Sequence, residues 1–256
     1  MKAMILVAGS GTRLRPLTEH LPKCMVPLAG KPVLQHTLEW CRGFGINEFV
    51  LNPSYLPEAI TSFFGDGQRF GVQIHYSFEE SPLGTAGGVK QAARFFDEPF
   101  LVWYGDNVCR CDLPRLWEAH RQRKRHGLAT IALHWREEVT QSGIVGLDGD
   151  DRITRFLEKP RAEEAFSHWV NAGIYVLEPA VLEAIPAGRP SDFGHEVFPS
   201  LLSHAAGLYG HRLSEKESLW AIDRPQDLAR VEKEFAEMQN DECRMQNGGK
   251  AERLKC

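Results

Sequence analysis

Long apolar runs are missing from this 256-residue chain. None approaches the roughly 20 residues that a membrane-spanning helix requires. The apolar start Met4–Val7 is cut short by a small-residue loop, Gly9–Gly11, and by Arg13, unlike the core of a signal peptide. We therefore expect a cytoplasmic chain that makes no contact with a membrane.

A basic excess and paired cysteines are missing as well. The 34 acidic residues outnumber the 30 lysines and arginines, and the net charge is −4, whereas nucleic-acid binders carry strongly basic surfaces. The basic run at residues 121–125 is therefore interpreted as a solvated helix end. Of the six cysteines, Cys109 and Cys111 form a lone C-x-C without the second pair that a zinc site requires. We expect reduced thiols and no nucleic-acid partner.

Short β-rich runs alternate with longer helical patterns over the first two thirds of the chain. This alternation is typical of βαβ units, in which a mainly parallel sheet is covered on both faces. The predicted strands are 3–7, 48–51, 72–76, 100–103 and 129–133, and the predicted helices are 32–42, 57–64, 85–96 and 114–125.

The pattern changes from Gly143 onward. A hairpin is predicted around the turn Asp148–Asp151. Because repeats and a clear linker are missing, we predict one domain over residues 1–238, with a first part at 1–134 and a second at 135–238. The polar residues 239–256 are predicted to be a disordered tail. The predicted strands of the second part are 144–147, 153–157 and 169–177, and its predicted helices are 179–184, 194–204 and 225–238.

The segment Leu6–Lys31 is the richest in chemistry and reads LVAGSGTRLRPLTEHLPKCMVPLAGK. Its glycines allow backbone N–H groups to approach a phosphate, and Arg13 and Lys23 add cationic donors. Taken alone, such a loop is more often a tight turn beside two surface cations. It lacks the Lys-Ser or Lys-Thr that closes a Walker A loop, and Leu14 stands where a dinucleotide fingerprint has its third glycine.

At its full length the segment resembles a known family. G-x-G-T-R-L-x-P-L-T, followed by P-K and P-L-A-G-K-P, closely resembles the signature of the sugar-1-phosphate nucleotidylyltransferases, and the resemblance continues to about Leu228. It implies a Rossmann-like three-layer α/β/α nucleotidyltransferase fold with a mixed, mainly parallel sheet. It also implies that Arg13 grips the leaving pyrophosphate and that Lys23 neutralises charge at the reacting phosphate. The loop residues to which it assigns nucleotide binding are Ala8, Gly9, Gly11, Thr12 and Arg13.

Two further motifs extend the resemblance into the nucleotide site. Ser81–Gly88 contains the family's P-L-G-T-A-G segment, which implies that Gly84 and Thr85 contact the base. The free amides at this helix start are also suited to an anion or a base edge. Asp106 follows an apolar strand at the edge where α/β sheets bind ligands. An isolated aspartate would be a turn former, but the family's G-D motif implies a catalytic Mg²⁺ ligand at Asp106.

A second group of motifs matches the sugar-phosphate half of the family, at Phe156–Pro160 and Val170–Tyr175. The resemblance implies that Glu158 accepts hydrogen bonds from sugar hydroxyls and that Lys159 holds the sugar phosphate. It also implies that Asn171 and Gly143 line the sugar pocket. Without the resemblance, Glu158 and Lys159 would be an ordinary exposed ion pair at a strand end.

The chain departs from the family pattern near Trp220. Many relatives read W-x-D-I-G-T-P-E-D, and the first Asp is a second metal ligand. Aligned on Pro225, that Asp falls on Ala221; aligned on Trp220, Asp223 lies one residue late, and a cytidylyltransferase-like spacing nearly restores it. We predict that Asp223 is the second metal ligand. The alternatives are a site with a single carboxylate and a protein that has lost activity.

The predicted reaction joins a nucleoside triphosphate to a sugar 1-phosphate and releases pyrophosphate, with Mg²⁺ as the cofactor. A sugar 1-phosphate is already ionised at neutral pH, so positioning and charge neutralisation suffice. Residues 82–87 resemble the guanylyltransferases of the family more than the thymidylyltransferases, which implies GTP with a mannose- or heptose-type 1-phosphate. The alternatives are a cytidylyl- or thymidylyltransferase acting on glucose 1-phosphate and an inactive regulatory module. A glycosyltransferase is disfavoured because residues 106–108 supply no D-x-D metal motif. The sequence is compatible with a homo-oligomer.

Overall fold

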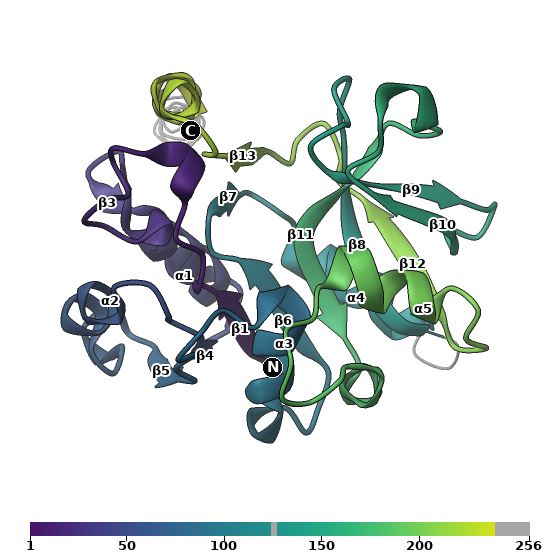
Figure 1. Ribbon diagram of the computed structural model, residues 1–256, viewed down its shortest axis with the longest axis horizontal. Helices are drawn as coiled ribbons and strands as arrows, with labels where there is room; N and C mark the ends of the chain where they lie inside the picture. The colour runs from purple at the N-terminus through teal and green to yellow at the C-terminus, as the bar shows by residue number, and fades with distance from the viewer. Residues whose placement is uncertain (124–126, 239–256) are drawn as a thin grey trace, which may run out of the picture.

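The computed structural model describes residues 1–123 and 127–238, and a nine-stranded sheet runs through it (Figure 1). The strands are β1 (Lys2–Leu6), β4 (Glu48–Leu51), β5 (Gln73–Tyr76), β6 (Phe100–Tyr104), β8 (Gly127–Trp135), β9 (Gly143–Leu147), β10 (Ile153–Glu158), β11 (Trp169–Leu177) and β12 (Gly207–Arg212). The main path has the order β10-β9-β11-β6-β1-β4-β5, and β8 pairs with both β11 and β12. Strands β6, β1, β4 and β5 are mutually parallel, whereas β11 is antiparallel to β6, β8 and β9. The sheet is therefore mixed, as predicted.

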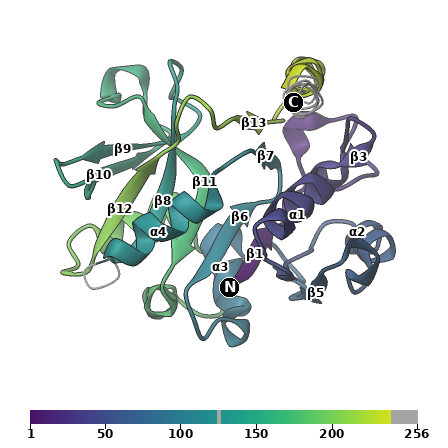
Figure 2. The same ribbon diagram turned by 180° about the vertical axis from the view of Figure 1, so that it is seen from behind.

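Helices cover both faces of the sheet. On one face lie α1 (Val33–Gly43), α2 (Pro57–Phe64) and α4 (Leu113–Arg123), and on the other lie α3 (Gly84–Gln91) and α5 (Phe198–Leu201) (Figures 1 and 2). Successive side chains of a strand face opposite sides. In β1, Ala3 and Ile5 therefore join the apolar cluster under α1, while Met4 joins the cluster under α3. The predicted three-layer α/β/α architecture is confirmed.

The second half of the chain differs more from the predicted elements than the first. The predicted helix at 194–204 begins as a π-helical turn, Phe193–Val197, and continues as α5 for only four residues. Strand β12 was not predicted, because Gly207 and Gly210 weaken its β-pattern. The parallel hydrogen bonding of β12 to β8 holds this segment extended, although its own sequence gives little β signal.

A two-stranded ribbon lies apart from the main sheet and was not predicted either. Strand β7 (Asn107–Cys109) pairs antiparallel with β13 (Leu219–Ala221), which sets Trp220 opposite Val108. Residues 225–238 then form the predicted helix. Its Phe235 packs in a third apolar cluster with Trp220 and with Leu14 of the loop after β1. The helix at residues 225–238 thus lies over the loop after β1, as Figure 1 shows.

Two remaining predictions concern the chain as a whole. Among the described residues, no helix combines the length and the apolarity needed to cross a membrane. The predicted tail at 239–256 and residues 124–126 of the basic helix end lie outside the described residues.

Candidate active site

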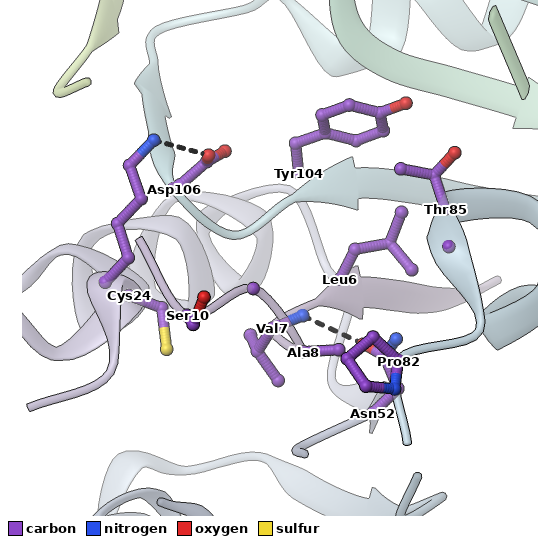
Figure 3. A pocket seen from close by; sticks show the side chains of 13 residues that line it. Leu6, Val7, Ala8, Ser10, Cys24, Asn52, Pro82, Thr85, Tyr104 and Asp106 are labelled. Atoms are coloured by element: carbon purple, nitrogen blue, oxygen red, sulfur yellow. Dashed lines mark hydrogen bonds and ion pairs between the residues drawn. The ribbon is translucent and has the colours of Figure 1, made fainter. Parts of the chain in front are cut away.

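A first pocket of about 320 Å³ lies at the carboxyl ends of β1 and β6 (Figure 3). This is the edge where α/β sheets bind their ligands. Gly11 and Thr12 do not line it; they lead into a 3-10 turn, Thr12–Leu14, and Arg13 reaches a second pocket. The predicted residues that do line the first pocket are Ala8, Gly9, Lys23, Gly84, Thr85 and Asp106. They are joined there by Asn52 and Tyr104, which were not predicted as site residues.

Asn52 and Glu79 form a buried chain of hydrogen bonds behind the first pocket. The backbone N–H of Val7 donates to Asn52 Oδ1 at 2.8 Å, and Asn52 Nδ2 donates to Glu79 Oε1 at 2.6 Å. The N–H of Leu83 donates to Glu79 Oε2 at 2.8 Å. Burial raises the pKa of Glu79, although these hydrogen bonds oppose the shift. Glu79 therefore ties the loop after β1 to the loop before α3.

Glu79→Gln is expected to destabilise the protein by about 1–3 kcal/mol, the cost of a buried donor left without an acceptor. Both Glu79 oxygens accept hydrogen bonds, one from the Asn52 amide and one from the Leu83 N–H. A glutamine would place its own NH₂ group against one of these donors. Urea unfolding measures the loss. The matched control is Glu80→Gln, since Glu80 is exposed; equal unfolding free energies for the two variants would contradict this account.

Lys23 joins two carboxylates that come from distant parts of the chain. Its Nζ lies 2.7 Å from Asp106 Oδ2 and 2.7 Å from Asp223 Oδ1, and Arg13 Nη2 lies 3.1 Å from the same Asp223 oxygen. Burial opposes the lysine charge, but the two carboxylates outweigh it and raise the pKa of Lys23. Burial also opposes the Asp223 charge, but Lys23 and Arg13 hold its pKa below the usual value. These pairings keep the ammonium and the Asp223 carboxylate ionised.

The β7–β13 ribbon explains why Asp106 and Asp223 meet. Asp106 directly precedes β7, and Asp223 follows β13 by two residues, while the register pairs Asn107 with Ala221. The antiparallel pairing therefore brings the two carboxylates to the same end of the ribbon. Their placement depends on this pairing and not on the spacing from Trp220 that made Asp223 ambiguous in the sequence.

The side chains around Lys23 suit a divalent cation in one respect. Asp106 and Asp223 both contact a single cationic atom, and their side chains remain 36% and 33% exposed. Mg²⁺ usually takes one or two carboxylates and completes its shell with phosphate oxygens and water. Residues 1–123 and 127–238 contain no group of three or more His, Cys, Asp or Glu side chains that could hold a metal ion by themselves. The donor set thus fits a cation shared with a bound phosphate.

A second pocket, of about 240 Å³, opens beside the first. Burial and the nearby Asp192 charge raise the pKa of Glu158 there. Lys159 has a φ of 47°, an unusual conformation that a non-glycine residue keeps only where the surrounding structure enforces it. The pocket is lined by all four predicted sugar residues, Gly143, Glu158, Lys159 and Asn171, and also by Arg13, Thr85, Tyr104, Asp106, Asp192 and Asp223.

The start of α3 differs from the expected anion-binding helix terminus. The backbone N–H groups of Ala86 and Gly87 both donate to the carbonyl oxygen of Ser191, at 3.0 and 3.1 Å. Ser191 in turn donates its N–H to the carbonyl oxygen of Leu83 at 2.8 Å. These two amides are therefore already bonded to a segment of the second half of the chain, which the motif at 82–87 gives no sign of.

Glu217 fixes the loop that leads into β13. It accepts hydrogen bonds from the backbone N–H groups of Asp112 and Ser214, each at 2.8 Å. Burial would raise the pKa of Glu217, but these N–H groups outweigh burial and lower it. A lowered carboxyl pKa stabilises the fold above the unfolded-state pKa of about 4.3, and this contribution is lost as the pH falls through the folded-state pKa.

Glu217→Gln is therefore expected to reduce the free energy of unfolding at neutral pH by about 1–3 kcal/mol. The difference from the native protein should shrink as the pH falls below about 4. Chemical denaturation over a pH series measures both effects, with the exposed Glu215→Gln as the matched control. A difference that stays constant across the series would show that the carboxylate charge contributes nothing.

The chain is similar to several known proteins. The family model described as Nucleotidyl transferase matches residues 2–221. A UTP–glucose-1-phosphate uridylyltransferase from Synechocystis sp. is 43% identical over 223 residues, which are 82% of this chain and 57% of that protein. A mannose-1-phosphate guanylyltransferase from Mycobacterium tuberculosis is 38% identical, over 89% of this chain and 62% of that protein. The chain thus spans about three fifths of the length of these relatives.

A solved structure adds a likeness of fold. The structure of HddC from Yersinia pseudotuberculosis complexed with GMP-PN superposes with a TM-score of 0.76 at 24% identity, over 91% of this chain and 99% of that one. The family match covers most of the chain and every strand named above. The chain belongs to the nucleotidyl transferase family.

Proposed function

We propose that this protein transfers a nucleotidyl group from a nucleoside triphosphate to a sugar 1-phosphate and releases pyrophosphate. The observation that carries the proposal is that the two pockets share Thr85, Tyr104 and Asp106. Two ligands that fill these pockets would meet beside Lys23 and the two carboxylates. Such a meeting point suits the transfer of a phosphate-linked group from one ligand to the other.

The side chains at the meeting point supply charge and not proton transfer. The sugar phosphate is already an anion, so its oxygen can attack the α-phosphorus while pyrophosphate leaves. Lys23 neutralises charge at that phosphorus, Arg13 holds the leaving pyrophosphate and Lys159 orients the sugar phosphate. Preorganised charges of this kind are the main source of catalysis in phosphoryl chemistry. Ala8, Gly9, Gly84 and Thr85 surround the nucleotide in this proposal, while Gly143, Glu158 and Asn171 surround the sugar.

Asp106 and Asp223 would hold Mg²⁺ together with phosphate oxygens of the nucleotide. The bound cation would lower the charge of the triphosphate and favour departure of pyrophosphate. Because Asp223 also contacts Lys23 and Arg13, its position is fixed from both sides. The single-carboxylate alternative is disfavoured, since the ribbon brings both aspartates to the same ammonium group.

Two substrate pairings have specific support. The motif at residues 82–87 and the guanylyltransferase relatives favour GTP with a mannose-type 1-phosphate. The 43% identity to a UTP–glucose-1-phosphate uridylyltransferase favours UTP with glucose 1-phosphate, a pairing that the motifs alone did not suggest. We take the guanylyl pairing as the first candidate and the uridylyl pairing as the second.

Pyrophosphate release tests the proposal directly. Four nucleoside triphosphates are combined with mannose, glucose and heptose 1-phosphates, with Mg²⁺ and with excess chelator. Mg²⁺-dependent release confined to one or two combinations is the expected outcome. Triphosphate binding without release in every combination would instead support the inactive regulatory module.

A further inference from the structure

One segment of the second half of the chain is bonded along the whole start of α3. Ser191 exchanges backbone hydrogen bonds with Leu83 and Ala86, as described above. Asp192 follows, and its Oδ2 accepts a hydrogen bond from Thr85 Oγ1 at 2.8 Å. The backbone N–H of Phe193 donates to the same Thr85 oxygen at 3.0 Å. The hydroxyl of Thr85 therefore bonds both a side chain and the backbone of this segment.

Asp192 is held from the other side as well. Its Oδ1 caps the following helical turn by accepting hydrogen bonds from the N–H groups of Gly194 and His195, at 2.8 and 3.1 Å. One carboxylate oxygen thus belongs to the cap and the other to Thr85. A carboxylate has about four acceptor sites, so Asp192 Oδ2 keeps capacity for one further donor.

Asp192 lines the second pocket together with Glu158 and Thr85. The two carboxylates are close enough that the Asp192 charge contributes to the raised pKa of Glu158. Gly194, whose N–H Asp192 caps, lies against Glu158, so that a Cβ atom there would overlap the Glu158 carboxylate. Neighbouring carboxylates accept hydrogen bonds only, which suits a ligand rich in hydroxyl donors.

We propose that Asp192 is a sugar-recognising residue that accepts a hydrogen bond from a hydroxyl of the sugar 1-phosphate, and that Thr85 sets its orientation. This inference rests on the proposed function, because it concerns the sugar that this pocket takes. Thr85 also lines the nucleotide pocket. The loop that surrounds the nucleotide therefore determines the geometry of the sugar pocket through one hydroxyl group.

Two variants of Asp192 test the contact. Asp192→Asn keeps the capping oxygen but loses the charge, and Asp192→Ser keeps a good N-cap while removing the carboxylate. Both substitutions should lower the affinity for the sugar 1-phosphate by about 10- to 100-fold, the range for a hydrogen bond to a charged group. The KM and dissociation constant of the triphosphate should stay within about twofold of the native values, a change too small to represent a lost hydrogen bond.

Thr85 is tested as a positioning residue. Thr85→Val removes the hydroxyl at nearly constant volume and should raise the KM of the sugar 1-phosphate, whereas Thr85→Ser keeps the hydroxyl and should lie closer to the native value. Sugar 1-phosphates deoxygenated at single positions locate the contact. The deoxy sugar that lacks the partner hydroxyl should bind equally well to the native protein and to Asp192→Asn.

Calorimetric titration of mannose and glucose 1-phosphates keeps this inference separate from the proposed function. If the native protein binds one of them without turnover, the proposed activity fails while the Asp192 variants still decide the contact. A sugar affinity within about twofold of native in both folded variants would overturn the role of Asp192. Equal losses of sugar and triphosphate affinity, with a lower Tm, would show that Asp192 acts only as a structural residue. Failure of the native protein to bind any of the sugar phosphates would overturn both proposals.

Discussion

Lys23→Met should reduce the turnover number by about 100- to 1,000-fold, the range for removing one preorganised charge from a reacting centre. Lys23 is the cation that both Asp106 and Asp223 contact, and its side chain is only 10% exposed. Methionine keeps most of the volume of the lysine stem and removes the ammonium group. Pyrophosphate release under saturating substrates measures the loss.

The same variant should bind a divalent cation more tightly when no nucleotide is present. Without the ammonium, Asp106 and Asp223 have no partner between them, and their mutual repulsion favours any cation that replaces it. The midpoint of thermal unfolding at increasing Mg²⁺ measures this effect. The matched control is Lys31→Met, because Lys31 pairs with Glu39 at the surface. A Lys23 variant with native turnover, or with unchanged response to Mg²⁺, would contradict the assigned position of this charge.

Gly84→Ala should lower the free energy of unfolding by about 3 kcal/mol through two separate costs. Gly84 has a φ of 73°, where an L-residue is strained, and a Cβ atom there would overlap the carbonyl oxygen of Ser191. Ser191 belongs to the backbone, so the overlap is relieved only by moving one of the two segments. A change of this size should lower the Tm by about 6–12 °C for a domain of this length.

The loss of stability at Gly84 should be accompanied by weaker binding of both substrates, because Thr85 lies next to it and contacts both pockets. Gly149→Ala is the matched control: Gly149 lies in the turn between β9 and β10, and a Cβ atom there meets no neighbour within 4 Å. Thermal unfolding and triphosphate titration of the two variants are compared. Similar Tm values would mean that the Ser191 segment moves away without cost.

The first half of the fold was predictable because its signals are local. Apolar strands such as Phe100–Tyr104 alternate with amphipathic helices, and the loop after β1 carries a long motif whose residues act close to one another. Strands β12 and β13 escaped prediction because Gly207, Gly210 and a three-residue length give little local signal. Their partners, β8 and β7, lie far away in the sequence and determine their structure.

The candidate site shows the same division. The motifs marked Lys23, Asp106, Glu158 and Lys159, and the structure brings all four to two adjoining pockets. Asn52, Glu79 and Asp192 carry no motif, because their importance lies in hydrogen bonds to backbone groups of other loops. The ambiguity of Asp223 could not be resolved from spacing, since its place is set by pairing across the ribbon.

The β7–β13 ribbon also determines when, during synthesis, the two carboxylates can come together. Asp106 leaves the ribosome early, but it can meet Asp223 only after β13 has been synthesised and has paired with β7. A nascent chain that ends after β12 would already carry the glycine loop and all four predicted sugar-pocket residues, yet it would lack the second carboxylate. Because a domain generally folds as a unit, we expect the two carboxylates to meet only after residues 219–223 have emerged.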